Sequence, residues 1–316
     1  MHLAASETTE IGHTGVVLDS VNGFDVIECV SCGFKHITPI PTPEELDQVY
    51  RHEYYTTDKP LYLERARDDL EWWNIVFSGR FDVFEGALPP ERRRILDVGS
   101  GPGIFLKHGK DRGWTTLGIE PSAKAAAHAR GLGLEIVEDF LSPASAPRLG
   151  TFDVIHMSEV LEHIPDPAAL LRLAFDLLNP GGLIYVEVPN DYNPFQHVLR
   201  ESMGYAPWWV GPPHHINYFT FETLAALQQR CGFEVILKEA TFPIDMFLLM
   251  GENYVGNDHL GRAVHAQRKR FEIELAKGGK TGLKRDLYRR LADMGLGRDA
   301  CIYGCKPSGQ LQGPIT

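Results

Sequence analysis

The sequence has few cysteines and no long hydrophobic run. Five cysteines occur among 316 residues, and an odd number in a chain of this length argues against a disulfide framework. No apolar run approaches the roughly 18 residues of a membrane span. The start, Met1 to Gly12, is polar and acidic and has no basic or apolar region of a signal peptide. We therefore expect a protein of the reducing cytoplasm that does not enter a membrane.

Positive charge is also scarce. Lysine and arginine total 31 against 42 aspartates and glutamates, so the formal net charge is -11. Proteins that hold nucleic-acid phosphates by charge need a basic surface, and this balance argues against RNA or DNA as a partner. One stretch keeps the nucleic-acid alternative open, because it is basic for so acidic a chain: Arg262, Arg268, Lys269, Arg270, Arg289 and Arg290.

The pattern of apolar residues changes at about residue 92. Residues 1–90 are irregular at first and then contain an aromatic-rich helical stretch over 44–84. From residue 92, short apolar runs alternate with amphipathic helical segments, which predicts βαβ units in a parallel, doubly wound α/β sheet. The predicted strands are 95–98, 115–119, 134–137, 152–155, 183–188, 234–238 and 300–306. The predicted helices are 123–130, 167–178 (with Asp166 as N-cap and Pro167 in its first turn) and 221–230, and the segment 250–298 is predicted to be helical.

A glycine-rich loop follows the first of these strands. Gly99, Gly101 and Gly103 alternate with other residues, which lets the backbone turn sharply and approach a ligand closely. The dinucleotide fingerprint GxGxxG places a pyrophosphate at a helix N-terminus. The loop here is GxGxG, and Asp97 at the strand end would repel a pyrophosphate but would suit a cationic ammonium group. We therefore expect an adenosyl ligand without phosphates and with a positive amino-acid end.

Acidic residues also follow the next two strands. Glu120 ends the strand 115–119, where a carboxylate can accept hydrogen bonds from both hydroxyls of a ribose. Asp139 and Phe140 follow the third strand, where a carboxylate can bind an adenine amino group and a ring can cover its face. Each residue alone has a structural explanation, but three acids at successive strand ends point to one ligand site.

In this order, the motifs resemble those of class I S-adenosylmethionine-dependent methyltransferases. The resemblance includes the block Phe152 to Glu159 and the segment Leu178 to Leu183. It implies a Rossmann-like, seven-stranded, doubly wound sheet whose last two strands are antiparallel. The implied organisation is an N-terminal extension over 1–90, a methyltransferase core over 91–242 and 299–308, and a helical insertion over 243–298 before the last strand.

The resemblance also implies which residues bind the cofactor, S-adenosylmethionine. The N-terminal tyrosines, Tyr50, Tyr54 and Tyr55, either fold over the cofactor as a lid or pack a helix onto the core. The predicted cofactor-binding residues are Asp97, Gly99, Ser100, Gly101, Gly103, Phe105, Glu120, Pro121, Asp139, Phe140, Ser158 and Tyr55.

An acid–histidine block follows the fourth strand. Glu159, Glu162 and His163 share one face of a helical turn, and His214-His215 occurs further along the chain. In one reading, His163 or His215 is a general base on a hydroxyl or amine, with Glu159 beside it. In a second, Glu159, Glu162, His163 and His215 bind a divalent metal in a site that resembles those of small-RNA 2′-O-methyltransferases and some ubiquinone-type catechol O-methyltransferases. In a third, the block only ties the loop together.

The N-terminal Cys29-Val30-Ser31-Cys32 resembles half of a zinc ribbon, which some small-molecule and sugar methyltransferases carry. A closed zinc site needs four ligands, and the first CxxC of a ribbon is missing. Only His13 lies upstream, with His36 just after the cysteines. We therefore expect a hairpin at Cys29 and Cys32 that holds no zinc.

The resemblance implies a cytoplasmic enzyme that methylates a small molecule, such as a sugar or secondary metabolite, at oxygen, nitrogen or carbon. Trp208-Trp209 and the insertion would shape the acceptor pocket. Two alternatives stay open: a metal-assisted RNA or catechol-type O-methyltransferase, and an inactive scaffold that binds S-adenosylmethionine. The expected partner is a small-molecule substrate, with no membrane or nucleic acid, and a homodimer is also considered.

Overall fold

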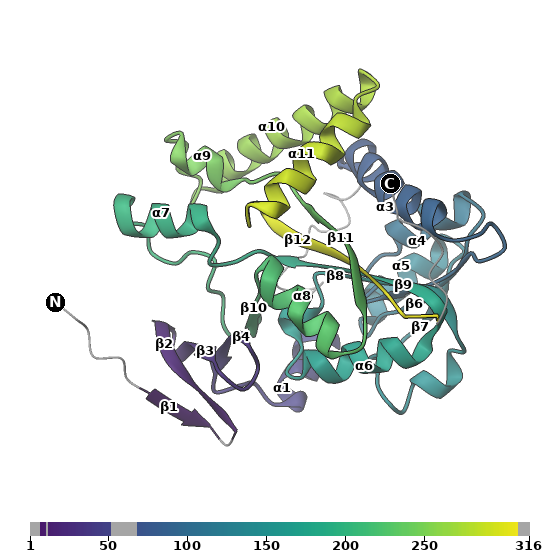
Figure 1. Ribbon diagram of the computed structural model, residues 1–316, viewed down its shortest axis with the longest axis horizontal. Coiled ribbons are helices and arrows are strands. Elements are labelled where there is room, and N and C mark those ends of the chain that lie inside the picture. Colours follow the sequence, from purple (N-terminus) through teal and green to yellow (C-terminus); the bar gives the residue numbers. More distant parts are fainter. Residues whose placement is uncertain (1–6, 11, 52–67, 309–316) are drawn as a thin grey trace.

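The computed structural model describes residues 7–10, 12–51 and 68–308 (Figure 1). These residues form a large sheet of seven strands and a small sheet of five. The large sheet has the order β11-β12-β9-β8-β5-β6-β7. Its strands are β5 (Arg94–Val98), β6 (Thr115–Ile119), β7 (Glu135–Val137), β8 (Phe152–Ser158), β9 (Leu178–Pro189), β11 (Glu234–Ala240) and β12 (Asp299–Cys305).

Six strands of the large sheet run in the same direction, and β12 is antiparallel to both of its neighbours, β9 and β11. Residues of β8 are buried from Phe152 to Met157, because helices cover both faces of the sheet. This double burial is why the strands read as continuous apolar runs in the sequence. The predicted seven-stranded, doubly wound α/β fold with an antiparallel last pair is confirmed.

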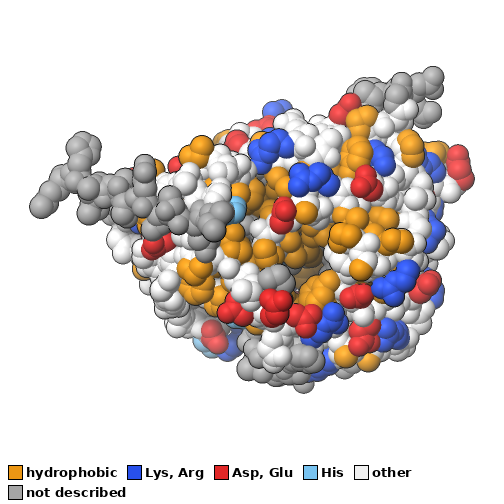
Figure 2. Space-filling model, turned by 90° about the horizontal axis from the view of Figure 1, so that it is seen from below, with side chains coloured by type: hydrophobic (Ala, Val, Ile, Leu, Met, Phe, Trp, Pro, Cys, Tyr) orange, Lys and Arg blue, Asp and Glu red, His pale blue; other side chains and the backbone are white. Residues whose placement is uncertain are grey.

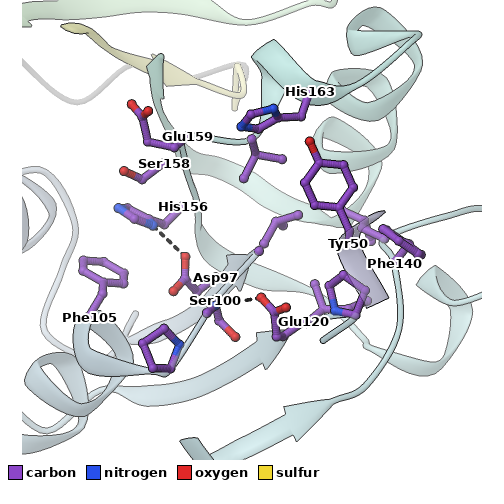
Figure 3. Close-up of a pocket in the computed structure, with 18 of the residues that line it drawn as sticks. Tyr50, Asp97, Ser100, Phe105, Glu120, Phe140, His156, Ser158, Glu159 and His163 are labelled. Carbon is purple, nitrogen blue, oxygen red and sulfur yellow. Dashed lines mark hydrogen bonds and ion pairs between the residues drawn. The ribbon is translucent and has the colours of Figure 1, made fainter. Parts of the chain in front are cut away.

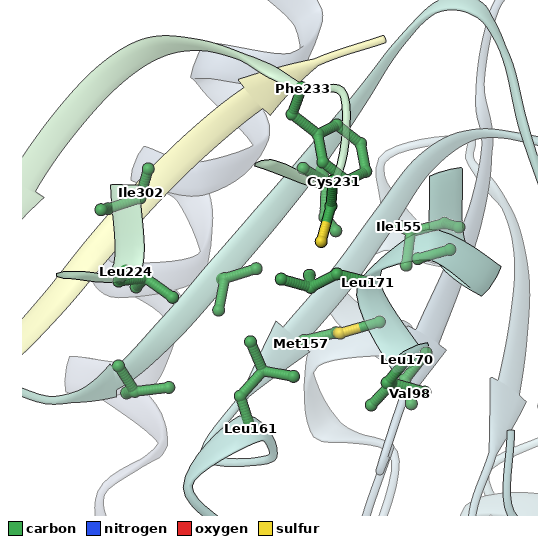
Figure 4. Close-up of a cluster of buried hydrophobic side chains, with 14 of the residues drawn as sticks. Val98, Ile155, Met157, Leu161, Leu170, Leu171, Leu224, Cys231, Phe233 and Ile302 are labelled. Atoms are coloured by element: carbon green, nitrogen blue, oxygen red, sulfur yellow. The ribbon is translucent and has the colours of Figure 1, made fainter. Parts of the chain in front are cut away.

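Helices pack on the two faces of the large sheet. One face contacts α3 (Leu70–Ala87), α4 (Ile104–Asp111) and α5 (Ala123–Gly131). The other contacts α6 (Pro167–Leu177) and α8 (Phe221–Arg230), whose leucines pack against β8 and β12 (Figure 4). Helix α6 begins as its sequence predicts, because the Asp166 carboxylate accepts a hydrogen bond from the Ala169 N–H at 2.9 Å.

The N-terminal region differs from the sequence-based prediction, because residues expected to be irregular form an antiparallel sheet. It consists of β1 (Glu7–Glu10), β2 (His13–Val21), β3 (Phe24–Cys29), β4 (Phe34–Thr38) and β10 (Asn217–Tyr218), in this order. The β2–β3 turn is Asn22-Gly23, with φ of 53° and 84°. Two positive φ values in a two-residue turn match the twist of a hairpin, and Asn-Gly strongly favours this turn. The Asn22-Gly23 dipeptide is thus the local sequence signal for this hairpin.

The helical stretch predicted over 44–84 is described in two parts. Helix α1 (Pro43–Gln48) begins at Thr42, whose hydroxyl accepts a hydrogen bond from the Glu45 N–H. Helix α3 begins at Leu70. Tyr54 and Tyr55, expected in a lid, lie outside the described residues.

The segment between β11 and β12 contains α9 (Asp245–Leu249), α10 (Asp258–Lys277) and α11 (Thr281–Asp293). Several of its basic side chains pair with acids of the same chain. Arg285 and Arg289 contact Glu239 of β11 at 3.1 and 3.2 Å, and Lys269 pairs with Asp69 at the start of α3. Internal ion pairing therefore accounts for part of the basic character of this segment.

The molecule is hollowed on the face shown in Figure 2, where hydrophobic side chains gather around the hollow. Basic and acidic side chains are interspersed around them on this face.

Within the described residues, none of the helices combines the length and the apolar character that crossing a bilayer requires. Helix α7 (Pro194–Met203) follows β9 and lies beside α9.

Candidate active site

The topology directs the search for a site to the carboxyl end of β5. The chain runs outward from β5 to β6 and β7 and then returns to β8 on the other side of β5. Where parallel strands diverge in this way, their helices leave on opposite faces and a crevice opens between them. A pocket lies there, lined by the loop after β5, the ends of β6 and β8, and side chains of α3 (Figure 3).

The glycine loop forms the floor of this pocket. Gly99, Gly101 and Gly103 have φ of 68°, 51° and 82°, which side chains rarely tolerate. A Cβ on Gly103 would lie 2.6 Å from the Leu134 side chain, so this glycine serves packing rather than the pocket. Ser100 lines the pocket, and its buried hydroxyl, which lies beside Gly118, has no hydrogen-bond partner among the described residues. A buried hydroxyl without a partner indicates a place for a polar ligand atom.

Glu120 reaches back from the end of β6 to this loop. Its Oε2 accepts a hydrogen bond from the Gly101 N–H and its Oε1 accepts one from the Ser122 N–H, both at 2.8 Å. Burial raises the pKa of Glu120 to about 7, although these two N–H groups favour the ionised form. Each oxygen of a carboxylate has two lone pairs, so both can accept a second donor from the pocket.

Asp97 belongs to a buried network that the sequence analysis missed. Asp97 Oδ1 lies 2.7 Å from His156 Nδ1, and His156 Nε2 lies 2.9 Å from an Arg80 nitrogen. Arginine only donates, so His156 Nε2 accepts and Nδ1–H donates to Asp97. Burial and the Arg80 charge lower the pKa of His156 well below its usual value, which agrees with a neutral ring. Asp97 thus accepts a hydrogen bond from an uncharged partner, the neutral imidazole of His156.

The other end of this network is an ion pair. Arg80 from α3 pairs with Glu187 of β9, and Glu187 also accepts a hydrogen bond from the Ser158 hydroxyl at 2.7 Å. Burial would raise the pKa of Glu187, but Arg80 holds it below its usual value. Burial raises the pKa of Asp97 well above its usual value, and Arg80 opposes the shift. A cationic group in the pocket would stabilise the ionised form of Asp97.

Aromatic rings fix the plane of His156. Its ring stacks on Phe105 at 3.7 Å between centroids and on Tyr185 at 5.0 Å on its other side. Phe105 is one of the predicted cofactor-binding residues. Phe105 does line the pocket, but it also holds His156 in the orientation that serves Asp97.

Asp139 and Phe140 lie at another side of the pocket, with an arginine from the N-terminal region. Asp139 Oδ1 accepts a hydrogen bond from the Phe140 N–H at 2.9 Å and lies 3.5 Å from Arg51. The Arg51 guanidinium also lies over the Phe140 ring, 4.9 Å from its centroid. Asp139 Oδ2 pairs with Arg148 at 3.1 Å. The N-terminal region therefore contributes a charged side chain to the predicted adenine site.

The acid–histidine block lies across the pocket from the glycine loop (Figure 3). Glu159 and His163 line the pocket, whereas Glu162 is buried behind them, with Oε1 3.4 Å from His163 Nε2. His163 Nδ1–H donates to the carbonyl of His214 at 2.7 Å, because a carbonyl can only accept. The His215 ring meets the His163 ring edge to face at 5.0 Å but is not part of the pocket lining.

Tyr50 completes this end of the pocket. Its ring centroid lies 5.5 Å from that of His163. Tyr50 belongs to the predicted lid, of which Tyr55 lies outside the described residues. Apart from Tyr55, His215, Glu162 and the packing glycine Gly103, the predicted site residues line this one pocket: Asp97, Gly99, Ser100, Gly101, Phe105, Glu120, Pro121, Asp139, Phe140, Ser158, Glu159 and His163. Their roles stay predictions.

The fold and the pocket place a candidate ligand site at the carboxyl ends of the parallel strands. A family model described as "Methyltransferase domain" matches residues 77–238, slightly more than half of the chain. The chain belongs to this family, and it is a class I S-adenosylmethionine-dependent methyltransferase.

Two curated relatives carry the name ubiquinone biosynthesis O-methyltransferase. The chain is 36% identical over 139 residues to that of Caulobacter sp. (strain K31), covering 41% of this chain and 54% of the relative. It is 33% identical over 179 residues to that of Ralstonia nicotianae, covering 52% of this chain and 71% of the relative. For the Caulobacter protein and its Escherichia coli counterparts, the chain spans little more than half of the relative's length.

Among solved structures, the plantazolicin methyltransferase BamL, in complex with a triazolic desmethylPZN analog and SAH, is similar in fold. The TM-score is 0.50 at 14% identity, and the match covers 82% of this chain and 94% of that one. At this level of identity the likeness concerns the fold alone.

Proposed function

We propose that this chain transfers the methyl group of S-adenosylmethionine to a hydroxyl oxygen of a small molecule, with His163 as general base. The observation that carries the proposal is the single pocket that joins the glycine loop and Glu120 to His163. The names of the relatives support oxygen as the acceptor atom.

The residues at the glycine-loop end fit the cofactor. S-Adenosylmethionine supplies a methyl group on a sulfonium that is itself the leaving group. Glu120 would accept hydrogen bonds from the ribose hydroxyls, and the buried Ser100 hydroxyl would bind a polar atom of the amino-acid end. Asp97, held by neutral His156, would face the ammonium group. Asp139 and Phe140 would contact the adenine.

At the other end, His163 is oriented as a base. Its Nδ1–H is bound to the His214 carbonyl, so in the neutral ring the lone pair is on Nε2. An acceptor hydroxyl beside Nε2 can lose its proton to it as the oxygen attacks. Glu162, 3.4 Å from Nε2, would stabilise the imidazolium that results. His215 and Tyr50 would hold the ring in place and are positioning residues.

Glu159 and Glu162 act as one unit. Burial and their mutual repulsion raise the pKa of Glu159 well above its usual value, and burial raises that of Glu162. Both shifts favour protonated carboxyls near neutral pH, and an imidazolium at His163 would in turn favour the ionised form of Glu162. Glu159 has φ of 57°, an uncommon conformation outside glycine that is associated with functional sites.

The metal-assisted alternative has weaker geometric support. Of the residues that the structure describes, those whose ligand atoms gather closely enough for a metal are not Glu159, Glu162, His163 and His215 but a set in the small sheet. A base that needs no metal is therefore the simpler mechanism.

The test replaces His163 and its neighbour His214. Removing a general base costs about 10²–10⁴ in turnover, so His163→Ala should lose activity on that scale while its affinity for the cofactor product S-adenosylhomocysteine, measured by calorimetry, is unchanged. His214→Ala is the matched control, because His163 uses only the backbone carbonyl of His214.

Turnover would be assayed with a panel of phenols, sugars and RNA, with and without chelator. Full activity of His163→Ala would refute the base assignment. Loss of wild-type activity in chelator, restored by magnesium or manganese, would favour the metal alternative instead.

A further inference from the structure

Four side chains with metal-binding chemistry meet in the small sheet. His13 begins β2, Cys29 ends β3, Cys32 lies in the turn that follows and His36 lies in β4. One ligand atom from each gathers in a group whose members all lie within 4.8 Å of one another. We propose that His13, Cys29, Cys32 and His36 form a structural zinc site.

The distances between these atoms fit a tetrahedral zinc ion. With Zn–S near about 2.3 Å and Zn–N near about 2.0–2.1 Å, tetrahedral angles place a sulfur and a nitrogen ligand about 3.6 Å apart. His13 Nδ1 lies 3.7 Å from Cys29 Sγ and 3.4 Å from Cys32 Sγ. The ring centroids of His13 and His36 lie 4.8 Å apart, and the angle between the ring planes is 86°. Both cysteines are free thiols in the structure.

The backbone around the cysteines has the form of a ligand turn. The Gly33 N–H donates to the Cys29 carbonyl at 2.9 Å, and Gly33 has φ of 73°. This tight turn folds Cys32 back beside Cys29, so that both sulfurs face His13. The pairing of β3 with β4 then positions His36 near Cys29. In this register Cys29 pairs with Phe34, and Ile27 pairs with His36. The fold thus supplies the two ligands that the sequence spacing does not reveal.

A hydrogen bond from Nδ1 of His36 leaves its other ring nitrogen, Nε2, able to bind a metal. Its Nδ1–H donates to the carbonyl of Ile37 at 2.8 Å, which places the lone pair of the neutral ring on Nε2. A backbone carbonyl that fixes the ring and its tautomer is the usual outer partner of a metal-binding histidine. Cys29 and His36 are buried, while His13 and Cys32 are partly exposed. Two thiolates and two imidazoles are a donor set that suits zinc.

The proposed ion would stabilise the wall of the methyl-acceptor site. In β4, His36 pairs with Asn217 of β10. The Asn217 amide donates to the carbonyls of Leu161 and Ile164 at 2.9 and 2.7 Å, on either side of His163. The Cys32 carbonyl in turn accepts a hydrogen bond from Arg230 of α8 at 2.7 Å. Zinc would thus hold the small sheet against the core, away from the methyl transfer itself.

This proposal reverses the expectation that the cysteines hold no zinc, which depended on two missing ligands. It is tested by elemental analysis of the full chain, purified without chelator from zinc-supplemented medium. Wild type should contain about one zinc per chain, and Cys29→Ser/Cys32→Ser should contain much less. Cys231→Ser is the matched control, because Cys231 borders the same cavity as Cys32 but lies outside the four-residue group; it should keep its zinc.

Two further measurements test the zinc site even if the Cys29→Ser/Cys32→Ser variant does not fold. His13→Ala changes a partly exposed ligand and should lose zinc to a chromogenic chelator faster than wild type does. Cobalt added to metal-free wild type should give intense visible bands of a tetrahedral site and a thiolate-to-cobalt charge-transfer band. Zinc retained in the cysteine variant would overturn the proposal. So would wild type that binds neither zinc nor cobalt, as a Cys29–Cys32 disulfide would cause.

Discussion

We expect Glu120 to make the cofactor affinity of this protein depend on pH. Its carboxylate, buried beneath the pocket, has a pKa raised to about 7 by burial. Ribose hydroxyls would donate to it, so they would bind the ionised form and release a proton where it was protonated. Affinity should therefore rise with pH through the range around 7 and level off above it.

The size of the effect follows from the ionised fraction. With a pKa of about 7, roughly a tenth of the carboxyl is ionised at about pH 6 and roughly nine tenths at about pH 8. The apparent dissociation constant scales inversely with the competent fraction. It should fall about tenfold between these two pH values, which equals about 1.4 kcal/mol.

Isothermal titration calorimetry with S-adenosylhomocysteine, in buffers of different ionisation enthalpy, measures both the affinity and the proton released. Glu120→Gln is the control, because it keeps the shape but cannot titrate. It should lose the Glu120 contribution to the pH dependence and bind more weakly. Glu120→Ala should weaken binding by about 1.5–3 kcal/mol, the range for hydrogen bonds to a charged group. An identical pH profile in wild type and Glu120→Gln, or unchanged affinity in Glu120→Ala, would refute the assignment of Glu120 to the ribose.

Two other substitutions test the surroundings of the pocket. Arg80→Met should destabilise the protein by about 3–5 kcal/mol in urea unfolding, because it leaves Glu187 charged and buried without its partner; Arg80→Met/Glu187→Leu should recover part of the loss, and a single variant as stable as wild type would contradict the buried pair. Asn217→Ala removes the hydrogen bonds that hold the turn around His163. It should lower turnover while the affinity for S-adenosylhomocysteine is kept; unchanged turnover would mean that the turn holds His163 without Asn217.

Much of the core was predictable because its strands are buried on both faces. A strand such as β8 must be apolar at nearly every position, and the glycine loop after β5 has few structural alternatives. Local signals also located helix α6, since Asp166 and Pro167 mark its start. These features depend on neighbouring residues, which the sequence shows directly.

The rest depends on contacts between distant residues. Arg80 lies in a helix among phenylalanines and gives no local sign that it reaches His156 and Glu187. His156 reads as one more residue of a buried strand. From sequence spacing alone, Cys29 and Cys32 form only half of a metal site. His13 comes close to them because β2 pairs with β3, and this pairing is not visible in the spacing. The Asn22-Gly23 turn was the one local signal that would have predicted this pairing.

The pairing of β4 with β10 has a consequence for protein engineering. Strand β10 belongs to the loop region between β9 and α8, yet its sheet partners come from the N-terminus. A chimera that exchanged only residues 1–51 with those of a related enzyme would bring a foreign edge to Asn217 and Tyr218 and to the turn around His163. The N-terminal segment and residues 190–220 therefore form one exchangeable block. Recombination designed to alter the acceptor should move both together but keep Arg51, because Arg51 contacts Asp139 and Phe140 at the predicted adenine site.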